Sequence, residues 1–247
     1  HMHTPAALCA LEKGAVAVVE KPVVVDVMQL QALIACVFKN QGRLYSCYHK
    51  RFSAFNALAK QDLRVIKGEP INYHCIVHEV PLPKKHWYNW PNSHTRLVSN
   101  GCHWIDHFLF LNDYPEYSEV NGFVAADGTI NCSVQAVNGA LFTMILTDEG
   151  SSRIGVQDHI ELRANGVTVS IKNGMRYFSE DSNRVLRRVS MSKLHAYRLM
   201  YQSIASDIKT GLHCDSLRSL TVNNQLMLDL EKKLFPHIET QRLKETA

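Results

Sequence analysis

The stretch from Ala15 to Pro22 constrains the fold of this chain more than any other. It reads Ala-Val-Ala-Val-Val-Glu-Lys-Pro, a short run of small and β-branched apolar residues that ends in two charges and a proline. An unbroken apolar run of this kind is typical of a strand buried on both faces, as in a parallel sheet. Because proline cannot donate to a central ladder, Pro22 ends the strand and leaves Glu20 and Lys21 at its carboxyl end. Open α/β sheets bind their ligands at that edge, although a strand end that only solvates its last charges has the same pattern.

The residues around this strand predict a parallel α/β arrangement. Thr4-Pro5 favours a helix start with Thr4 as the N-cap, and Gly14 favours its end. Asp26 is predicted to cap a second helix that ends at Gly42, and residues 43–48 have the pattern of a second strand. Helix, strand, helix and strand in this order indicate a parallel sheet. Four elements are too few for a complete nucleotide-binding domain.

The rest of the chain predicts a different kind of sheet. From residue 118 to about 179, short strand-like runs alternate with Asp-Gly, Asn-Gly and Glu-Gly pairs. Such pairs favour hairpins, so this sheet is predicted to be largely antiparallel. The remaining segments predict a strand over 71–79 and helices over 53–63, 101–111, 192–210 and 216–234.

Composition places the chain among ordinary globular proteins and excludes several classes. Apolar residues make up 46% and charged residues 20% of the 247 residues, and the longest apolar run, 32–38, is too short to cross a membrane. The net charge of +4 is too small to indicate nucleic acid, and the basic cluster at 184–188 is interpreted as a solvated strand edge or loop. Seven widely spaced cysteines without a C-x-x-C pair favour reduced, buried thiols in a cytoplasmic protein over disulfides or a zinc site.

Four segments, residues 3–22, 48–52, 66–71 and 101–106, together resemble the Gfo/Idh/MocA oxidoreductases. The run from His3 to Gly14 resembles that family's H-x-x-x-A-x-x-A-L-x-x-G helix, and Glu20-Lys21-Pro22 resembles the end of the strand that follows it. Residues 48–52 resemble its Y-x-x-R-F segment, residues 66–71 resemble the segment that leads into its second sheet, and residues 101–106 match its G-x-H-x-x-D helix. The segments stand in the family's order over most of the chain.

This resemblance implies an α/β fold in two parts. Residues 1–50 would form the C-terminal part of a Rossmann-like NAD(P)-binding domain with a partial parallel sheet. Residues 51–247 would form an α+β substrate and oligomerisation domain, with an open, mostly antiparallel sheet and helices on one face. The implied function is that of an NAD- or NADP-dependent dehydrogenase acting on a sugar, polyol or related hydroxyl compound. The implied assembly is a homodimer or homotetramer formed through the large sheet, with no nucleic acid or membrane partner.

The same resemblance implies which residues form the site. Lys21 corresponds to the family lysine that contacts the substrate hydroxyl near the nicotinamide, and His103 corresponds to the family's acid/base histidine. An imidazole suits that role because it takes and returns a proton near neutral pH. Glu20, Pro22 and Trp87 are further cofactor-binding candidates, and the resemblance also implies a cis peptide bond before Pro22.

Tyr48, Arg51, Ser99 and Asp106 are the candidates for substrate binding. Ser99 stands four residues before His103, where many family members have an aspartate on the same helix face. A serine cannot supply the negative charge that stabilises an imidazolium, so this departure bears against ordinary polyol dehydrogenation. Asp106 follows His103 by about one turn and would either orient it or pair elsewhere.

A metal site is a weaker alternative for the same helix. His103 and His107 stand at i and i+4 with Asp106 beside them, and two histidines and a carboxylate could bind zinc. The sequence has no H-E-x-x-H glutamate and no spaced third ligand, so no metal is expected.

The G-x-G-x-x-G phosphate turn of dinucleotide-binding domains has no counterpart in the sequence. None of the 12 glycines forms even G-x-G, so the sequence shows nothing that would hold a pyrophosphate. One expectation is therefore a truncated chain that is inactive by itself. The alternatives are a non-catalytic dimerisation or binding module derived from the family, or an NAD-using glycosidase of the same fold.

Overall fold

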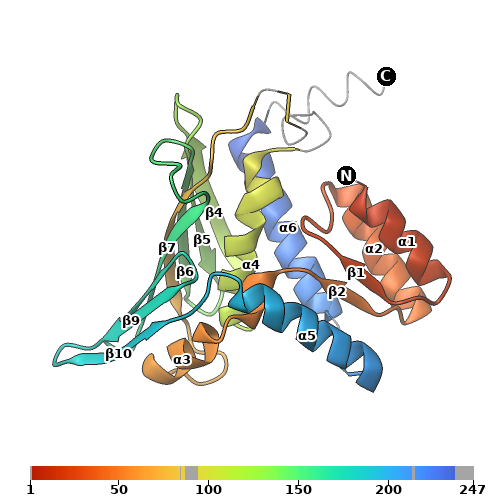
Figure 1. Ribbon diagram of the computed structural model, residues 1–247. Coiled ribbons are helices and arrows are strands. Elements are labelled where there is room, and N and C mark those ends of the chain that lie inside the picture. The colour runs from red at the N-terminus through yellow and green to blue at the C-terminus, as the bar shows by residue number, and fades with distance from the viewer. Residues whose placement is uncertain (1, 84, 87–93, 213–214, 237–247) are drawn as a thin grey trace.

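The computed structural model describes residues 2–83, 85–86, 94–212 and 215–236, and two sheets organise this part of the chain (Figure 1). The smaller sheet consists of β1 (Ala17–Val19) and β2 (Leu44–Ser46), which pair in parallel. Helices α1 (His3–Glu12) and α2 (Val27–Asn40) alternate with these strands and pack on each other. The predicted parallel α/β arrangement of this region is confirmed.

Two details of this region differ from the prediction. Val18 is 46% exposed while Ala17 and Val19 are buried, so the prediction of a strand buried on both faces is wrong. The reason is that successive side chains of a strand point to opposite faces, and the face on which Val18 lies is left exposed in the described structure. The prediction that Thr4 is an N-cap is also wrong, because the helix already includes His3. The Thr4 hydroxyl instead donates to the Val23 carbonyl oxygen at 2.8 Å, which ties α1 to the segment after β1.

The connection from β1 to α2 has the cis bond that the resemblance implied and the N-cap that the sequence predicted. The peptide bond between Lys21 and Pro22 is cis. A carboxylate oxygen of Asp26 accepts a hydrogen bond from the Gln29 amide at 2.7 Å, so Asp26 caps α2. The helix ends at Gln41 in the left-handed conformation, one residue before Gly42. Glu20, Lys21 and Pro22 therefore lie at the carboxyl end of β1, as the opening stretch indicated.

The larger sheet has eight strands in the order β10-β9-β8-β7-β3-β6-β5-β4. Every neighbouring pair is antiparallel except β3 with β6, so the prediction of a mostly antiparallel sheet is confirmed. The strands are β3 (Asn72–His78), β4 (Tyr117–Val124), β5 (Ile130–Ala136), β6 (Leu141–Thr147), β7 (Gln157–Ala164), β8 (Val167–Lys172), β9 (Arg176–Glu180) and β10 (Val185–Ser190).

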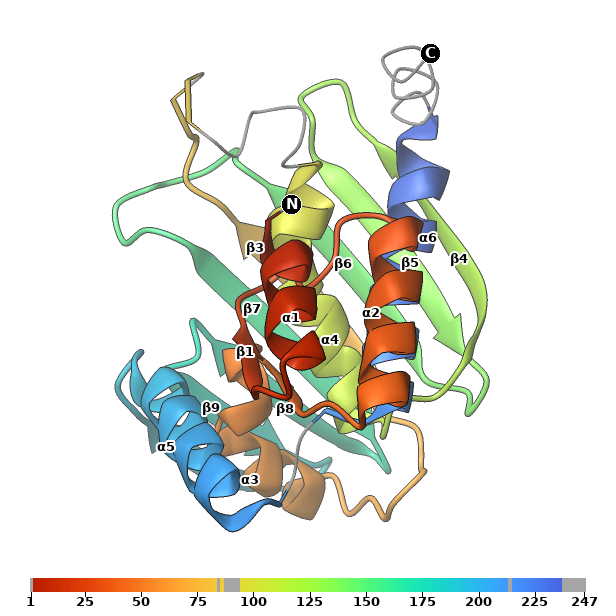
Figure 2. The same cartoon turned by 90° about the vertical axis from the view of Figure 1, so that its right-hand side faces the viewer.

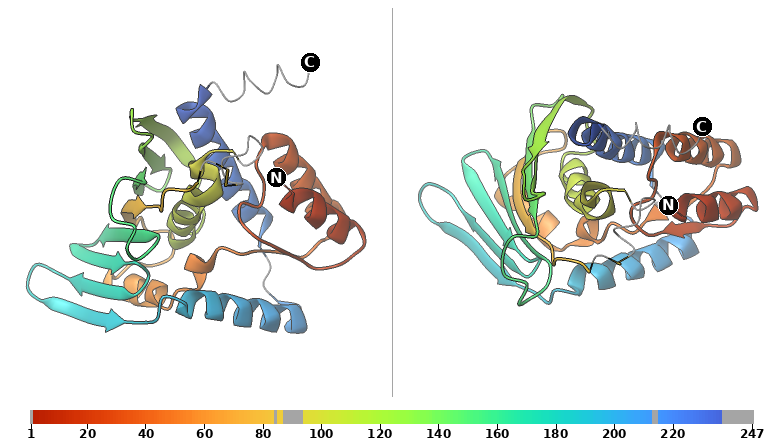
Figure 3. Two further views of the ribbon diagram at one scale, coloured as in Figure 1. Left: turned by 45° about the horizontal axis from the view of Figure 1, so that its top comes forward. Right: turned by 90° about the horizontal axis from the view of Figure 1, so that it is seen from above.

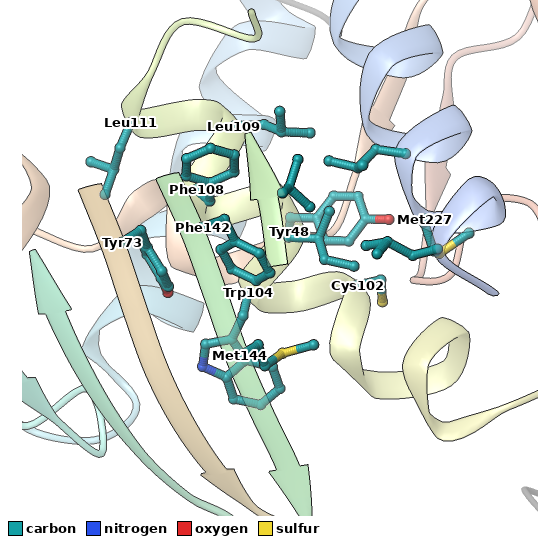
Figure 4. Close-up of a cluster of buried hydrophobic side chains, with 14 of the residues drawn as sticks. Tyr48, Tyr73, Cys102, Trp104, Phe108, Leu109, Leu111, Phe142, Met144 and Met227 are labelled. Carbon is teal, nitrogen blue, oxygen red and sulfur yellow. The ribbon is translucent and has the colours of Figure 1, made fainter. Parts of the chain in front are cut away.

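Helices cover one face of the large sheet. Helix α4 (Cys102–Leu111) and helix α6 (Leu217–Leu234) lie between this sheet and the smaller α1–α2 unit (Figure 3). The core between them includes Tyr73 and Phe142 from the sheet and Phe108 from α4, all fully buried (Figure 4). Residues that alternate with these point to the other face, where Ile76 is 54% exposed. Alternating burial is what an antiparallel sheet covered on one side produces.

The remaining helices lie at one end of the large sheet (Figure 2). A short 3-10 helix, η1 (His49–Phe52), leads into α3 (Phe55–Asp62), which packs against β8 and β9. Helix α5 (His195–Thr210) packs along η1 and contributes Met200 and Ile204 to a small core with β2. Both ends of α5 and α6 agree closely with the predicted ranges.

The surface features match the sequence predictions with one exception. β10 is an edge strand, as the basic cluster indicated, and its Arg187 pairs with Asp62 at 3.1 Å. The six described cysteines are free; five are buried and Cys9 is exposed, so the prediction of buried thiols fails for Cys9. Among the described residues, no helix is both long and apolar enough to cross a membrane.

Candidate active site

A cavity of about 230 Å³ is lined both by residues next to the smaller sheet and by residues of the larger sheet. Its walls come from the segment after β1, from η1, from α4 and the π-helical turn before it (Leu97–Gly101), from the start of β7, from the end of β8, and from the first turn of α5. The cavity therefore has walls from both parts of the chain. Lys21 from the first part and His103 from the second both line it.

Lys21 is held in place by the turn that precedes α4. Its Nζ donates to the carbonyl oxygen of Ser99 at 2.9 Å and to Oδ1 of Asn100 at 3.4 Å. An ammonium group has three N–H donors, and these two neutral acceptors account for two of them among the described residues. One donor of Lys21 is left for a ligand oxygen in the cavity.

His103 lies in the first turn of α4 and is 6% exposed. Its Nδ1 atom has no hydrogen-bond partner among the described residues, and its ring stands edge-on to the rings of Tyr48 and His49. Burial, and then the positive charges of Lys21 and Lys50, lower the pKa of His103 well below its ordinary value of 6.5. The imidazole is therefore neutral at pH 7, which is the form that accepts a proton.

His49 forms the wall beside His103. Its ring stacks on Tyr197 of α5 with 4.0 Å between ring centroids, and it stands 4.7 Å from the centroid of His103. Burial and the nearby Lys50 lower the pKa of His49 to about 3. Its Nδ1 also has no partner among the described residues. The cavity thus has two neutral imidazoles in contact.

A buried ion pair forms another part of the cavity wall. Lys50 of η1 pairs with a carboxylate oxygen of Asp158, and the same oxygen accepts from the Trp104 indole at 3.0 Å. The Lys50 ammonium also lies 4.7 Å from the centre of the Trp104 ring. Burial raises the pKa of Asp158, but Lys50 and these hydrogen bonds outweigh it and lower the pKa below its usual value. Asp158 is therefore an ionised carboxylate, and its second oxygen has no partner among the described residues.

The four residues predicted to bind substrate do not line this cavity in the described structure. Arg51 donates to Asp106 from Nε, at 3.1 Å to Oδ1 and 2.8 Å to Oδ2, and from Nη2 to Oδ1, and it also pairs with Asp215 before α6. The Tyr114 hydroxyl donates to Asp106 at 3.4 Å. Burial raises the pKa of Asp106 to about 6, and Arg51 opposes that rise. Asp106 therefore holds Arg51 and does not orient His103. Tyr48 is fully buried under the guanidinium of Arg51.

Ser99 contributes through its backbone. The expectation that Ser99 shares a helix face with His103 assumed regular α-helical spacing, but Leu97–Gly101 is π-helical. A wider turn moves residues four apart away from the same face. The Ser99 carbonyl oxygen holds Lys21, a role that does not depend on the serine side chain.

The other cofactor candidates lie around the end of β1. Glu20 is exposed, and one of its carboxylate oxygens accepts from the Tyr201 hydroxyl at 3.3 Å. The Pro22 carbonyl oxygen lies 2.8 Å from Nδ1 of His3. Trp87 lies outside the described residues.

His107 is fully committed to its neighbours. Its Nδ1 lies 3.1 Å from the Tyr73 hydroxyl and its Nε2 lies 2.8 Å from Oδ1 of Asn56. Because both ring nitrogens are occupied, His107 cannot bind a metal without breaking a buried hydrogen bond. The weaker zinc alternative therefore has no support here, and no cluster of metal-binding residues occurs within the described ranges.

Sequence reasoning missed His49, Lys50 and Asp158. His49 and Lys50 stand inside the 48–52 segment that carried part of the resemblance, and this position could have pointed to them. Asp158 stands in a hairpin strand that shows no local sign of a site. Only the pairing of β7 with β3 brings it to the cavity.

The dinucleotide expected from the resemblance fits this structure only at one end. The cavity with Lys21 and His103 is the part of the structure where the resemblance expects the reacting end, and the described residues supply no diphosphate site. The N-terminus of α2, which follows β1, is capped by the carboxylate of Asp26, and a carboxylate at that position repels a phosphate.

Comparisons with known proteins establish the fold. No family model matches the chain, and no curated protein matches it significantly. Solved structures do match: a dehydrogenase from Chromobacterium violaceum is 12% identical with a TM-score of 0.79, over 99% of this chain and 77% of that one. A UDP-N-acetylglucosamine 3-dehydrogenase from Acidithiobacillus ferrooxidans is 16% identical with a TM-score of 0.77, over 96% of this chain and 76% of that one. A protein of gentamicin A biosynthesis, solved in complex with NAD, is 12% identical with a TM-score of 0.73, over 96% and 73%. At such identities the likeness shows a shared fold, and the expected fold class is confirmed.

Proposed function

We propose that the cavity is the active site of an NAD(P)-dependent oxidoreductase that acts on a sugar, polyol or related hydroxyl compound. The observation that carries the proposal is the meeting of Lys21 and His103 in one cavity, from opposite parts of the chain. The similarity to structures named as dehydrogenases supports it.

The two residues divide the work on a substrate hydroxyl. The free N–H of Lys21 donates to the hydroxyl oxygen and stabilises the negative charge that develops when the proton leaves. Neutral His103 accepts that proton. The low pKa of His103 keeps it in the accepting form throughout the neutral range. These residues account for substrate binding and proton transfer; they do not account for hydride transfer.

The proposal is tested with two variants and two readouts. Lys21→Met and His103→Asn are each expected to abolish NAD(P)-linked oxidation across a panel of sugars and polyols, while calorimetry shows cofactor affinity close to that of the wild type. His159→Asn, on the exposed face of β7, is the control for histidine removal. Normal turnover in either site variant would refute the assigned roles.

A second candidate function is a non-catalytic binding module derived from the same fold. The Asp26 cap at the N-terminus of α2 and the absence of G-x-G from the sequence favour it. Calorimetric titration of the chain with NADH and NADPH separates the two candidates. No heat at millimolar cofactor would support the module, whereas saturable binding would support the enzyme.

A further inference from the structure

The charged side chains around the cavity do not balance. Lys21, Lys50 and Lys193 line it, and Asp158 is the one carboxylate among its described lining residues. Asp158 is already paired with Lys50. Lys193, in the segment before α5, donates to the carbonyl oxygen of Val156 at 3.1 Å. Neither Lys21 nor Lys193 has a carboxylate partner among the described residues, so the cavity carries an excess of positive charge.

Glu79 does not correct this excess. Glu79 is close enough to Lys21 for the two charges to interact, but Glu79 does not line the cavity. Glu79 accepts a hydrogen bond from Asn100 and lies 3.6 Å from Arg96. Its carboxylate is thus shared with a guanidinium, and the ammonium of Lys21 faces the cavity with neutral acceptors only.

The cavity also has an acceptor ready for hydroxyl groups. Asp158 is 8% exposed, and its Oδ1 is buried without a partner among the described residues. A buried carboxylate oxygen left unpaired costs free energy unless a donor reaches it. The other oxygen is satisfied by Lys50 and Trp104, and Asp158 lines the cavity, so a ligand hydroxyl that reaches Oδ1 would supply the donor it lacks.

The remaining walls suit one face of a sugar ring. Ile160 and Ile171 from the sheet supply apolar surface, and the stacked pair of His49 and Tyr197 supplies a flat aromatic wall. The volume of about 230 Å³ lies just below the ~300–1,000 Å³ of drug-sized ligand sites. It therefore suits a single ring better than a nucleotide sugar. The first turn of α5 borders the cavity through Ala196 and Tyr197, and its backbone dipole adds positive potential there.

We propose that the ligand of this cavity is a polyhydroxylated acid about the size of one sugar ring, whose oxyanion contacts Lys193 and whose hydroxyls reach Asp158 and Lys21. The oxyanion is a carboxylate or a phosphate ester, since both satisfy an ammonium. This inference names the substrate class of the proposed oxidoreductase, and it rests on that proposed function.

The test compares acids with neutral compounds of nearly the same shape. Glucuronate is paired with glucuronamide, gluconate with gluconamide, and glucose 6-phosphate with glucose, and each is titrated calorimetrically into the full chain without cofactor. At least one acid is expected to bind about tenfold or more tightly than its neutral counterpart, the gain typical of one charge-assisted hydrogen bond. Lys193→Gln is expected to remove most of that preference. Lys209→Gln, in the last turn of α5 and away from the cavity, is the matched control and is expected to keep it.

The outcomes separate the two proposals. Equal affinity for every acid and its neutral counterpart would overturn the inference, as would a preference that Lys193→Gln leaves unchanged. Which acid is preferred decides between carboxylate and phosphate. Because the readout is binding without cofactor, a preferred acid that is never oxidised would overturn the proposed oxidoreductase and leave the ligand class intact.

Discussion

Buried histidines are expected to make this protein lose stability in mild acid, and the contribution of His107 to that loss can be isolated. Burial, with the positive charge of Lys50, lowers its pKa from 6.5 to about 3, and its contacts with Tyr73 and Asn56 fix a neutral ring. Asp158 is the charged group that opposes this shift. In the unfolded chain the imidazole titrates near 6.5. Between pH 6.5 and 3 the unfolded state therefore binds one proton more than the folded state. The free energy of unfolding falls as the pH falls through this window.

The magnitude follows from the two pKa values. At pH 5 the folded ring is still neutral, while the unfolded ring is about 1.5 pH units below its pKa and almost fully protonated. At about 1.36 kcal/mol per unit, His107 alone lowers the free energy of unfolding by about 2 kcal/mol between pH 7.5 and pH 5. His49 and His103, whose pKa values are also lowered, add losses of the same sign. Asp106 acts in the opposite direction, because its pKa is raised to about 6 and stability rises as the pH falls from there toward 4.

A difference measurement isolates the contribution of His107. Urea unfolding of the wild type and of His107→Gln is measured at pH 7.5 and pH 5.0. The glutamine can still reach Tyr73 and Asn56 but does not titrate, so the variant is expected to lose about 2 kcal/mol less than the wild type on acidification. The contribution of Asp106 is present in both proteins and drops out of the difference. The reasoning is refuted if both proteins lose the same free energy of unfolding.

Two further predictions concern stability. Asp158→Asn leaves the ammonium of Lys50, with a side chain 11% exposed, without its carboxylate, and is expected to cost about 3–5 kcal/mol; an unchanged urea midpoint would contradict the pairing. At Gly122 an added Cβ would lie 2.3 Å from the Asn131 carbonyl oxygen, whereas at Gly128 nothing lies within 4 Å. Gly122→Ala is therefore expected to cost about 1–3 kcal/mol for the clash beyond the ~1 kcal/mol that a positive φ costs in Gly128→Ala, and equal thermal shifts in the two variants would show that the close approach does not matter.

Local signals predicted most of the fold. Asp26 is the N-cap of α2 as the sequence indicated, and α5 and α6 end close to the predicted positions. Such signals act over one helical turn, so a single sequence contains them. The exposure of Val18 could not be predicted, because it depends on which elements cover that face of β1 in the folded chain. An apolar run indicates which side chains a strand can bury, but it does not indicate which elements cover the strand.

Only part of the candidate site could be predicted from the sequence, for the same reason. Lys21 and His103 stood in segments that carry a family resemblance, and the structure places both at the cavity. Arg51 and Asp106 stood in the same segments and instead bind each other beside it. Sequence spacing cannot tell a residue that lines the cavity from one that only supports its wall, because polar residues of both kinds occur in the same segments. Asp158 needed the register of β7 on β3 to be found.

The unsatisfied atoms of the cavity bear on both candidate functions. Nδ1 of His49, Nδ1 of His103 and Oδ1 of Asp158 are buried without partners among the described residues. A buried polar atom left unpaired costs about 1–3 kcal/mol, against a typical total stability of about 5–15 kcal/mol. Three such atoms gathered around one cavity are therefore a substantial cost that a ligand with hydroxyl groups would remove. The two candidate functions consequently differ in whether the chain binds a dinucleotide, and not in whether the cavity binds a hydroxylated ligand.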